Sequence, residues 1–319
     1  MSGDGIDVRM DGDFEANAFP HFLIYGQTGS GKTCLANTLP GPRVVISTEN
    51  NSLLPLKKSD DAIPRAYRPD GEDSRVPKAK ISVESWAQAE KAVRWIEQNR
   101  EKYGIRSVIF DTVTGLSELC RYVELGGRPG MTTSDKLDRQ GYGSILLKLE
   151  GLRYRMQKLP LFVCWVAGMR NGSEERGTKG QLLVDLVGQA ADRYPQGVEF
   201  LLPVERVVGA GGRSKINVHT VPSGIWRAKA YSQGGSGGNC LPIEVPDLTV
   251  LLAKCGWLPD EEALEVLAAT KAAPAAGAAP AAAKAVGSSA ARPAAQPAGG
   301  SAAPKAGTAR KGGVGFTLD

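Results

Sequence analysis

Residues 26–33 have the sequence GQTGSGKT, which fits the pattern G-x-x-x-x-G-K-[ST] at every fixed position. The glycines let the backbone wrap closely around phosphate groups and turn its N–H groups inward, while the following helix directs its positive end at the anion. In this arrangement Lys32 reaches the β- and γ-phosphates of a nucleotide, and the Thr33 hydroxyl binds Mg²⁺. We therefore predict a phosphate-binding loop that holds ATP and Mg²⁺.

The neighbouring segments have the character that such a loop requires. The apolar strand HFLIY (21–25) precedes it, and a helical segment follows it. The predicted nucleotide contacts are Gly26, Gln27, Thr28, Gly29, Ser30, Gly31, Lys32, Thr33 and Cys34. A glycine-rich turn without a ligand is the alternative.

A carboxylate for the magnesium ion is expected at the end of a neighbouring strand. In VIFDT (108–112), three apolar residues precede Asp111. We predict that Asp111 and Thr33 hold Mg²⁺ together; an aspartate that only caps the next helix is the alternative. The position after Asp111, where many phosphate-binding-loop proteins carry a hydrolytic carboxylate, is Thr112.

Glu49 can supply the missing carboxylate. It follows the apolar residues of VVISTEN (44–50), the next predicted strand after the loop and its helix. The carboxyl ends of parallel strands lie at one edge of a sheet, so Glu49 should lie near the loop and Asp111. From there it can act as a general base on a water molecule beside the γ-phosphate. A solvated glutamate at a strand end is the alternative.

Strands and helices alternate along the chain that positions these groups. We predict further strands at 106–113 and 161–168, and helices at 85–100, 114–125 and 142–159. This order favours an α/β fold with a mainly parallel sheet covered by helices on both faces. A strand-rich end, with strands at 198–210, 216–221 and 225–231, should add an antiparallel extension.

Composition divides the chain into three parts. We expect an N-terminal extension at 1–17, a core at 18–265 and a disordered tail at 266–319, because the tail is rich in Ala, Pro and Gly and cannot bury enough apolar surface to fold. The tail ends in GGVGFTLD, either a frayed terminus or a peptide that docks on a partner.

Charge and rare residues exclude several function classes. The net charge of +5 belongs to the tail, because the chain up to residue 265 has 33 basic and 33 acidic side chains. Five scattered cysteines without a CxxC pair argue for reduced thiols, and two histidines argue against histidine-based catalysis. The chain has no apolar run long enough to span a membrane and begins with a polar, acidic segment. We expect a cytoplasmic protein.

The order of GQTGSGKT, STEN, FDTVTGL and IWRAKA over residues 18–235 resembles the RecA-like ATPases. More narrowly, it is similar to phage-encoded, RecA-related ATPases of single-strand annealing. In this family the catalytic glutamate ends the strand that follows the loop's helix, as Glu49 does here. The family also places a polar sensor residue at the end of the fourth strand. This chain has Ala167, Gly168 and Met169 there, and Arg170 is the nearest substitute.

The resemblance implies a homo-oligomer with ATP at the interfaces between subunits. Two basic residues on a late strand then reach the neighbour's phosphates, and Arg227 and Lys229 match them. A solvated strand face is the alternative. The resemblance also implies DNA-binding loops at 126–141 and 168–180. The predicted DNA-binding residues are Arg128, Lys136, Arg139, Arg170, Arg176 and Lys179.

These features lead to one main functional hypothesis. The chain would be an ATP-hydrolysing protein that oligomerises on single-stranded DNA and promotes annealing or homologous recombination, with its tail contacting a single-strand binding protein or another recombination partner. Glu174 and Glu175 dilute the second loop, however, and the core is neutral. A nucleotide-dependent switch or assembly ATPase that acts on protein partners without DNA is the alternative. A small-molecule kinase is a third hypothesis, which Glu49 fits less well.

Overall fold

The computed structural model describes residues 19–49, 79–126, 137–172, 174, 178–208, 214–232 and 240–272. The chain divides into two units, Met1–Ala276 and Gly277–Asp319, and all described residues belong to the first. The predicted N-terminal extension and the GGVGFTLD end of the tail lie outside the described residues. So do three of the predicted DNA-binding residues, Arg128, Lys136 and Arg176.

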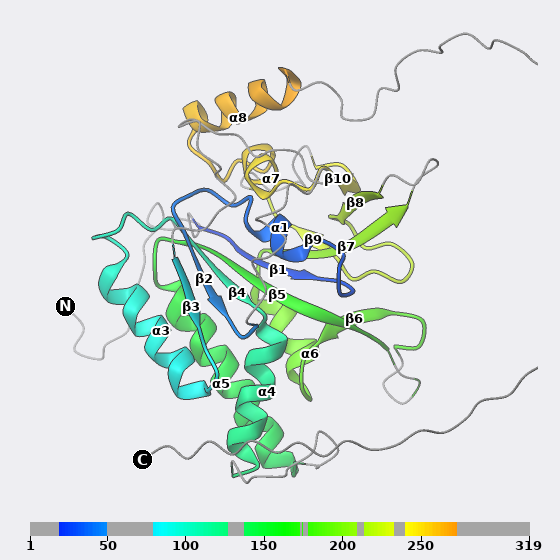
Figure 1. The fold of residues 1–319 in the computed structure, drawn as a ribbon. Coiled ribbons are helices and arrows are strands. Elements are labelled where there is room, and N and C mark those ends of the chain that lie inside the picture. Colours follow the sequence, from blue (N-terminus) through cyan, green and yellow to red (C-terminus); the bar gives the residue numbers. More distant parts are fainter. Residues whose placement is uncertain are drawn as a thin grey trace, which may run out of the picture. The chain divides into compact units, whose positions relative to one another are not determined.

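Ten strands form one sheet in the described part of the chain (Figure 1). They are β1 (His21–Tyr25), β2 (Arg43–Ser47), β3 (Ala79–Ser82), β4 (Ser107–Asp111), β5 (Phe162–Asn171), β6 (Leu182–Asp185), β7 (Phe200–Val208), β8 (Ser214–His219), β9 (Lys229–Ala230) and β10 (Ile243–Glu244). The helices are α1 (Lys32–Ala36), α3 (Trp86–Asn99), α4 (Val113–Glu124), α5 (Arg139–Gln157), α6 (Ala190–Arg193), α7 (Leu248–Lys254) and α8 (Asp260–Ala272). Helix α8 continues past residue 265, where we expected the core to end.

The centre of the sheet is parallel and has the strand order β7-β1-β5-β4-β2-β3. Strands β8 and β10 extend it in antiparallel fashion beyond β7, and β6 and β9 pair in antiparallel fashion with β5 and β7. Strand β5 separates β1, which leads into GQTGSGKT, from β4, which ends at Asp111. The predicted α/β fold, with a mainly parallel sheet and an antiparallel extension, is confirmed.

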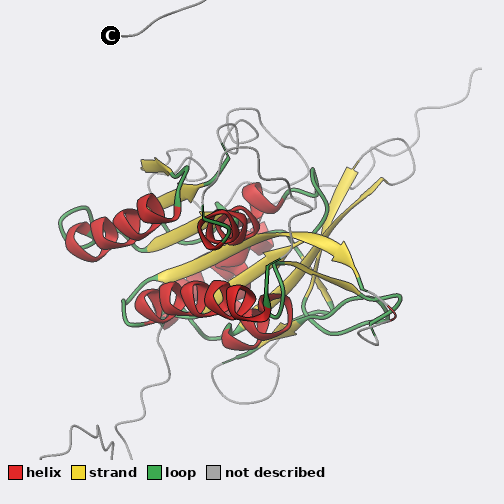
Figure 2. Cartoon of the chain, turned by 90° about the horizontal axis from the view of Figure 1, so that it is seen from below, coloured by secondary structure: helices red, strands yellow, loops and turns green. Residues whose placement is uncertain are grey.

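Helices cover both faces of the sheet (Figure 2). Alternate residues of each strand face opposite ways. Leu23 and Tyr25 of β1 therefore belong to the core on the side of α3, α4, α5 and α6, whereas Phe22 and Ile24 belong to the core on the side of α1, α7 and α8. Each face thus has its own hydrophobic core. Among the described residues, no helix combines the length and apolar character needed to cross a membrane.

A side chain caps the first turn of each of the three helices α3, α4 and α5. Ser85 accepts a hydrogen bond from the backbone N–H of Gln88 at α3, as the sequence predicts. Thr112 caps α4 in the same way through Gly115. Asp138 caps α5, which therefore begins three residues before the predicted start at 142. The cap at Thr112 also explains why β4 ends at Asp111 and not at the predicted residue 113.

The predicted loop at 168–180 is in part a β-hairpin. Strand β5 continues to Asn171, and its last residues pair with β6, with Gly168 opposite Asp185. The apolar run of Leu182–Asp185 supplies the partner strand, and Met169 packs against the core. This part of the prediction was wrong because a partner strand some fifteen residues away in the sequence, and not local polarity, decides the conformation.

The predicted strand at 225–231 is reduced to the two residues of β9. Ser223 and Trp226 exchange backbone hydrogen bonds, and Gly224 has a φ of +50°. The carbonyl oxygen of Ile225 accepts from the N–H of Leu182, and β8 pairs with β7 from Val204 onward, so residues 225 and 226 do not extend β9 along β7.

Candidate nucleotide-binding site

The GQTGSGKT loop has a backbone conformation that favours glycine at two positions. Gly29 and Gly31 have φ values of +80° and +94°, and Gly31 is followed directly by α1. A Cβ at Gly31 would lie 2.4 Å from Cδ1 of Ile216, and one at Gly26 would lie 2.2 Å from the carbonyl oxygen of Val204. The β7–β8 ribbon therefore packs tightly against the outside of the loop.

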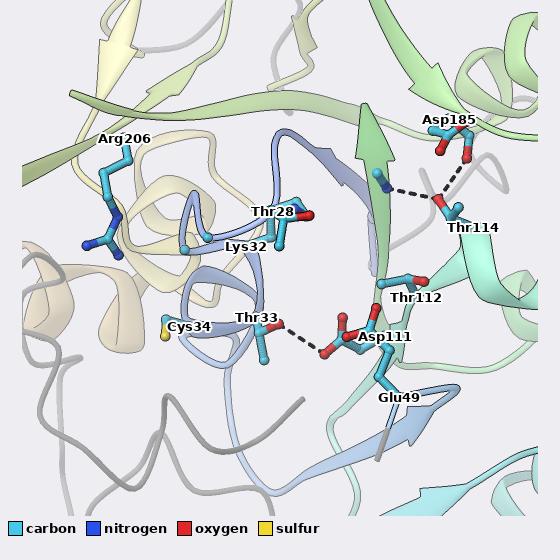
Figure 3. A pocket seen from close by; sticks show the side chains of 13 residues that line it. Thr28, Lys32, Thr33, Cys34, Glu49, Asp111, Thr112, Thr114, Asp185 and Arg206 are labelled. Atoms are coloured by element: carbon cyan, nitrogen blue, oxygen red, sulfur yellow. Dashed lines mark hydrogen bonds between the residues drawn. The ribbon is translucent and has the colours of Figure 1, made fainter. Parts of the chain in front are cut away.

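The side chains of Lys32 and Thr33 turn in opposite directions from the start of α1. The Lys32 ammonium donates hydrogen bonds to the carbonyl oxygens of Gly26 (2.9 Å) and Gln27 (2.7 Å), within the curve of the loop. The Thr33 hydroxyl donates to Oδ2 of Asp111 over 3.0 Å (Figure 3). The structure thus brings together the two residues that we predicted to hold magnesium, although they are far apart in the sequence.

Burial controls the charge of these groups. It raises the pKa of Asp111 to about 6; the hydrogen bond from Thr33 opposes this rise, and the nearby Glu49 carboxylate adds to it. Burial lowers the pKa of Lys32, and the charge of Asp111 opposes that effect. A hydroxyl and a buried carboxylate are hard oxygen donors, which fit Mg²⁺ completed by phosphate oxygens and water.

Glu49 lies at the same edge of the sheet as Asp111. Strands β2 and β4 pair with Ser47 opposite Asp111, which places Glu49 just beyond the paired residues. Its backbone is fixed by two hydrogen bonds with the Ser47 hydroxyl (2.7 and 3.1 Å) and one from Lys80 (2.9 Å). Its exposed side chain lines the same cavity as Asp111 (Figure 3). The predicted proximity is therefore present in the structure.

The cavity has a volume of about 680 Å³, within the usual range of small-molecule sites. Most of the predicted loop residues line it, including Cys34, which is buried at the start of α1. Three further lining residues, Thr114, Asp185 and Arg206, were not among the predicted site residues, and Gly168 was predicted only as part of the 168–180 segment. Thr114 lies in the FDTVTGL segment, whereas Asp185 and Arg206 belong to no local motif.

Thr114, on α4, connects this helix to β5 and β6. Its hydroxyl donates to the carbonyl oxygen of Asp185 (2.7 Å) and accepts from the N–H of Gly168 (2.8 Å). The base of the β5–β6 hairpin is thereby attached to α4 at the edge of the cavity. Gly168 lies where the resemblance to RecA-like ATPases predicts a polar sensor; it has no side chain, and its backbone N–H donates to Thr114.

Arg227 and Lys229 lie outside the cavity of their own chain. Arg227 makes an ion pair with Asp192 (3.4 Å) and donates to Oε1 of Gln181 (3.1 Å). Lys229 donates to the carbonyl oxygen of Gln196 (3.1 Å). Both side chains are half-buried and flank the buried Ala228, although only Lys229 belongs to β9.

The described DNA-binding candidates come from separate elements. Arg139 is the exposed first residue of α5, and Arg170 is half-buried in β5. Lys179 is exposed near the end of the β5–β6 hairpin and makes an ion pair with Glu174. This ion pair offsets one of the positive charges that we expected to face DNA.

A glycine-rich loop between a buried strand and a helix, with a threonine–aspartate pair at one edge of a parallel sheet, defines a P-loop nucleotide-binding core. The sequence model of one family, described as AAA domain, matches residues 18–205, which is more than half of the chain. The chain therefore belongs to the AAA domain family of P-loop ATPases. A search of the curated proteins finds no match.

Proposed function

We propose that the chain is a magnesium-dependent ATPase. The observation that carries this proposal is the Thr33–Asp111 hydrogen bond with the exposed Glu49 carboxylate in the same cavity. Lys32 and the backbone N–H groups of the loop would bind the phosphates. Thr33 and Asp111 would hold Mg²⁺, which would supply positive charge to the phosphates. Glu49 takes a proton from a water molecule while the oxygen of that water attacks the γ-phosphorus. The bond to the β-phosphate oxygen breaks, and ADP and phosphate form.

We also propose that the sites work in an oligomer, with Arg227 and Lys229 contacting the nucleotide of a neighbouring subunit. Two half-buried cations on one side of the chain, outside its own cavity, support this arrangement. Mixing Arg227→Ala with Lys32→Ala protein in equal amounts tests it. If the two variants assemble at random, about a quarter of the interfaces join a pocket with Lys32 to a neighbour with Arg227. The activity of the mixture should therefore return to about a quarter of the wild-type level. No recovery in mixed oligomers would exclude action between subunits.

The polymer that best fits this ATPase is single-stranded DNA, on which it would promote annealing or homologous recombination in the cytoplasm of a bacterial or phage-infected cell. The supporting observation is the β5–β6 hairpin, whose base lines the cavity and whose outer part carries Arg170 and Lys179. Thr114 attaches this hairpin to α4, so a change at the γ-phosphate can be transmitted to it.

An ATPase assay with and without single-stranded DNA tests this use. We expect stimulation that falls steeply with rising salt, because phosphate contacts release counterions. If hydrolysis in low salt ignores DNA while the protein still oligomerises, the alternative of a switch or assembly ATPase on protein partners is correct. The ion pair between Glu174 and Lys179, together with the balanced charge of residues 1–265, favours that alternative. Removing residues 273–319, which leaves α8 intact, shows in parallel whether the basic tail causes any stimulation.

A further inference from the structure

Among the described residues that line the cavity, Lys32 and Arg206 are the basic ones. Arg206 lies on β7 directly opposite Ile216 of β8, so the two side chains are on the same face of the ribbon. That face packs on the phosphate-binding loop, since a Cβ at Gly31 would lie 2.4 Å from Ile216 Cδ1 and 3.8 Å from Arg206 Nη2. A hydrogen bond of 3.1 Å from Nη1 to the Ser214 hydroxyl helps to orient the guanidinium.

Arg206 and the acidic groups lie on opposite sides of the loop. Strand β7 is next to β1 on one side, whereas β5, β4 and β2 follow β1 on the other. Asp111 and Glu49 come from that second side, and Asp185 lies on β6, which pairs with β5. Figure 3 shows Lys32 between Arg206 and this acidic group of side chains. The magnesium ion and the γ-phosphate belong at the acidic end, so the opposite end faces the rest of the nucleotide.

We propose that Arg206 binds the nucleoside diphosphate part of the nucleotide in its own chain, through the α- or β-phosphate. This inference rests on the proposed ATPase function and adds to it a binding residue in the same subunit. A guanidinium offers several donors in a planar fork and suits phosphate oxygens. Because ADP and ATP share these phosphates, Arg206 contributes equally to the binding of both nucleotides.

Equilibrium binding of a fluorescent ADP and of ATP, each with Mg²⁺, tests the proposal on the full chain. We expect Arg206→Ala to weaken both nucleotides by about 10- to 100-fold, and Arg206→Lys to weaken them less. Lys215→Ala is the matched control, because it removes an exposed positive charge from the same ribbon outside the cavity. At subsaturating ATP, the ATPase rate of Arg206→Ala should fall by about the same factor as its affinity for ATP, whereas Lys215→Ala should keep the wild-type rate.

Two results would overturn the inference. One is an ADP affinity of Arg206→Ala equal to that of Lys215→Ala, with both variants as stable as wild type. The other is a loss of turnover at saturating ATP with unchanged ADP affinity, which would make Arg206 part of the hydrolytic step. If wild-type protein binds neither nucleotide, the proposed function itself fails, and this outcome is distinct from the other two.

A second feature concerns two cysteines outside the site. The sequence suggests scattered thiols, yet the fold places Sγ of Cys240 2.8 Å from Sγ of Cys255. Cys240 lies just before β10, and Cys255 ends α7. An ion pair of 2.6 Å between Glu244 and Lys254 joins the same two elements. The hydrogen bond from Cys255 lowers the pKa of Cys240, which makes Cys240 the better nucleophile.

We infer that Cys240 and Cys255 form a disulfide by exchange with a low-molecular-weight disulfide. The Cys240 thiolate attacks one sulfur of the reagent and releases one thiol; Cys255 loses its proton, attacks Cys240 and releases the second thiol. The bond would join the segment before β10 to α7. Helix α7 in turn contacts the segment after α1, because the N–H of Leu248 donates to the Thr38 hydroxyl (2.8 Å). Oxidation therefore stabilises the layer of helices behind the phosphate-binding loop.

Treatment with oxidised glutathione, followed by peptide mapping without reduction, tests this pair. We expect one cross-linked peptide pair, from Cys240 and Cys255, and a higher urea midpoint that reductant reverses. Cys240→Ser should lose both effects, whereas Cys120→Ser, which alters a separate buried thiol, should keep them. Five titratable thiols after oxidation, or a mixture of other pairs, would overturn the inference.

Discussion

Replacing Asp111 by asparagine should stabilise the protein without ligands, while it removes the carboxylate that we propose for Mg²⁺. Asp111 is 1% exposed, and burial raises its pKa from 3.8 to about 6. Near neutral pH the folded protein therefore holds a carboxylate whose charge is disfavoured. The rise from 3.8 to about 6 corresponds to a cost of about 3 kcal/mol for the charged form. Asparagine removes this cost and keeps an oxygen that accepts from Thr33.

The pH dependence follows from the sign of this shift. The folded state binds more protons than the unfolded state between pH 3.8 and about 6, so stability falls as the pH rises through that window. We expect Asp111→Asn to exceed wild type by about 3 kcal/mol in free energy of unfolding at pH 7.5. At pH 4, where the folded carboxyl is already protonated, the gain shrinks to about 0.5 kcal/mol.

Urea denaturation of the full chain without nucleotide and with a metal chelator measures both values. Asp247→Asn is the matched control, because burial also raises the pKa of Asp247 to about 6, but this residue caps α7 outside the cavity. Both variants should gain stability at pH 7.5. Only Asp111→Asn should lose the stabilisation that ATP and Mg²⁺ give. If Asp111→Asn is no more stable than wild type at pH 7.5, or if its gain is the same at pH 4, the reasoning is refuted.

Two further predictions concern the loop and the hairpin. Gly31→Ala should lower the free energy of unfolding by more than Gly29→Ala. Both positions have positive φ, which costs alanine about 1–3 kcal/mol, but of the two only Gly31 has a neighbour within 4 Å of the added Cβ. Equal losses in urea denaturation would contradict the close packing of Gly31 on Ile216. Thr114→Val should lower the DNA-stimulated ATPase rate by a larger factor than the basal rate, because it removes both hydrogen bonds between α4 and the hairpin. An unchanged ratio of stimulated to basal rate would show that the hairpin is not coupled to the site.

The part of the site that local spacing determines could be predicted from the sequence. GQTGSGKT specifies its own turn and the start of α1, and the apolar runs before Glu49 and Asp111 specify strands. The rule that parallel strands end at one edge then brings these three segments together, as the pairing of Ser47 with Asp111 shows. The P-loop core and its mainly parallel sheet follow from the same local signals.

The remaining residues enter the site through pairings between distant segments. Asp185 lines the cavity because β6 folds back on β5, and Arg206 does so because the β7–β8 ribbon packs on Gly31. Neither position has a local pattern that distinguishes it from an ordinary surface residue. The same holds for Cys240 and Cys255, which approach each other only when α7 folds against the segment before β10.

The most direct test of the account is ATP hydrolysis by Glu49→Gln under single-turnover conditions, with ATP binding measured on the same sample. If Glu49 is the general base in this cavity, the variant binds ATP and Mg²⁺ as wild type does and hydrolyses ATP at least about 100-fold more slowly. Hydrolysis by Glu49→Gln at the wild-type rate would contradict the assignment of Glu49 and the mechanism built on it.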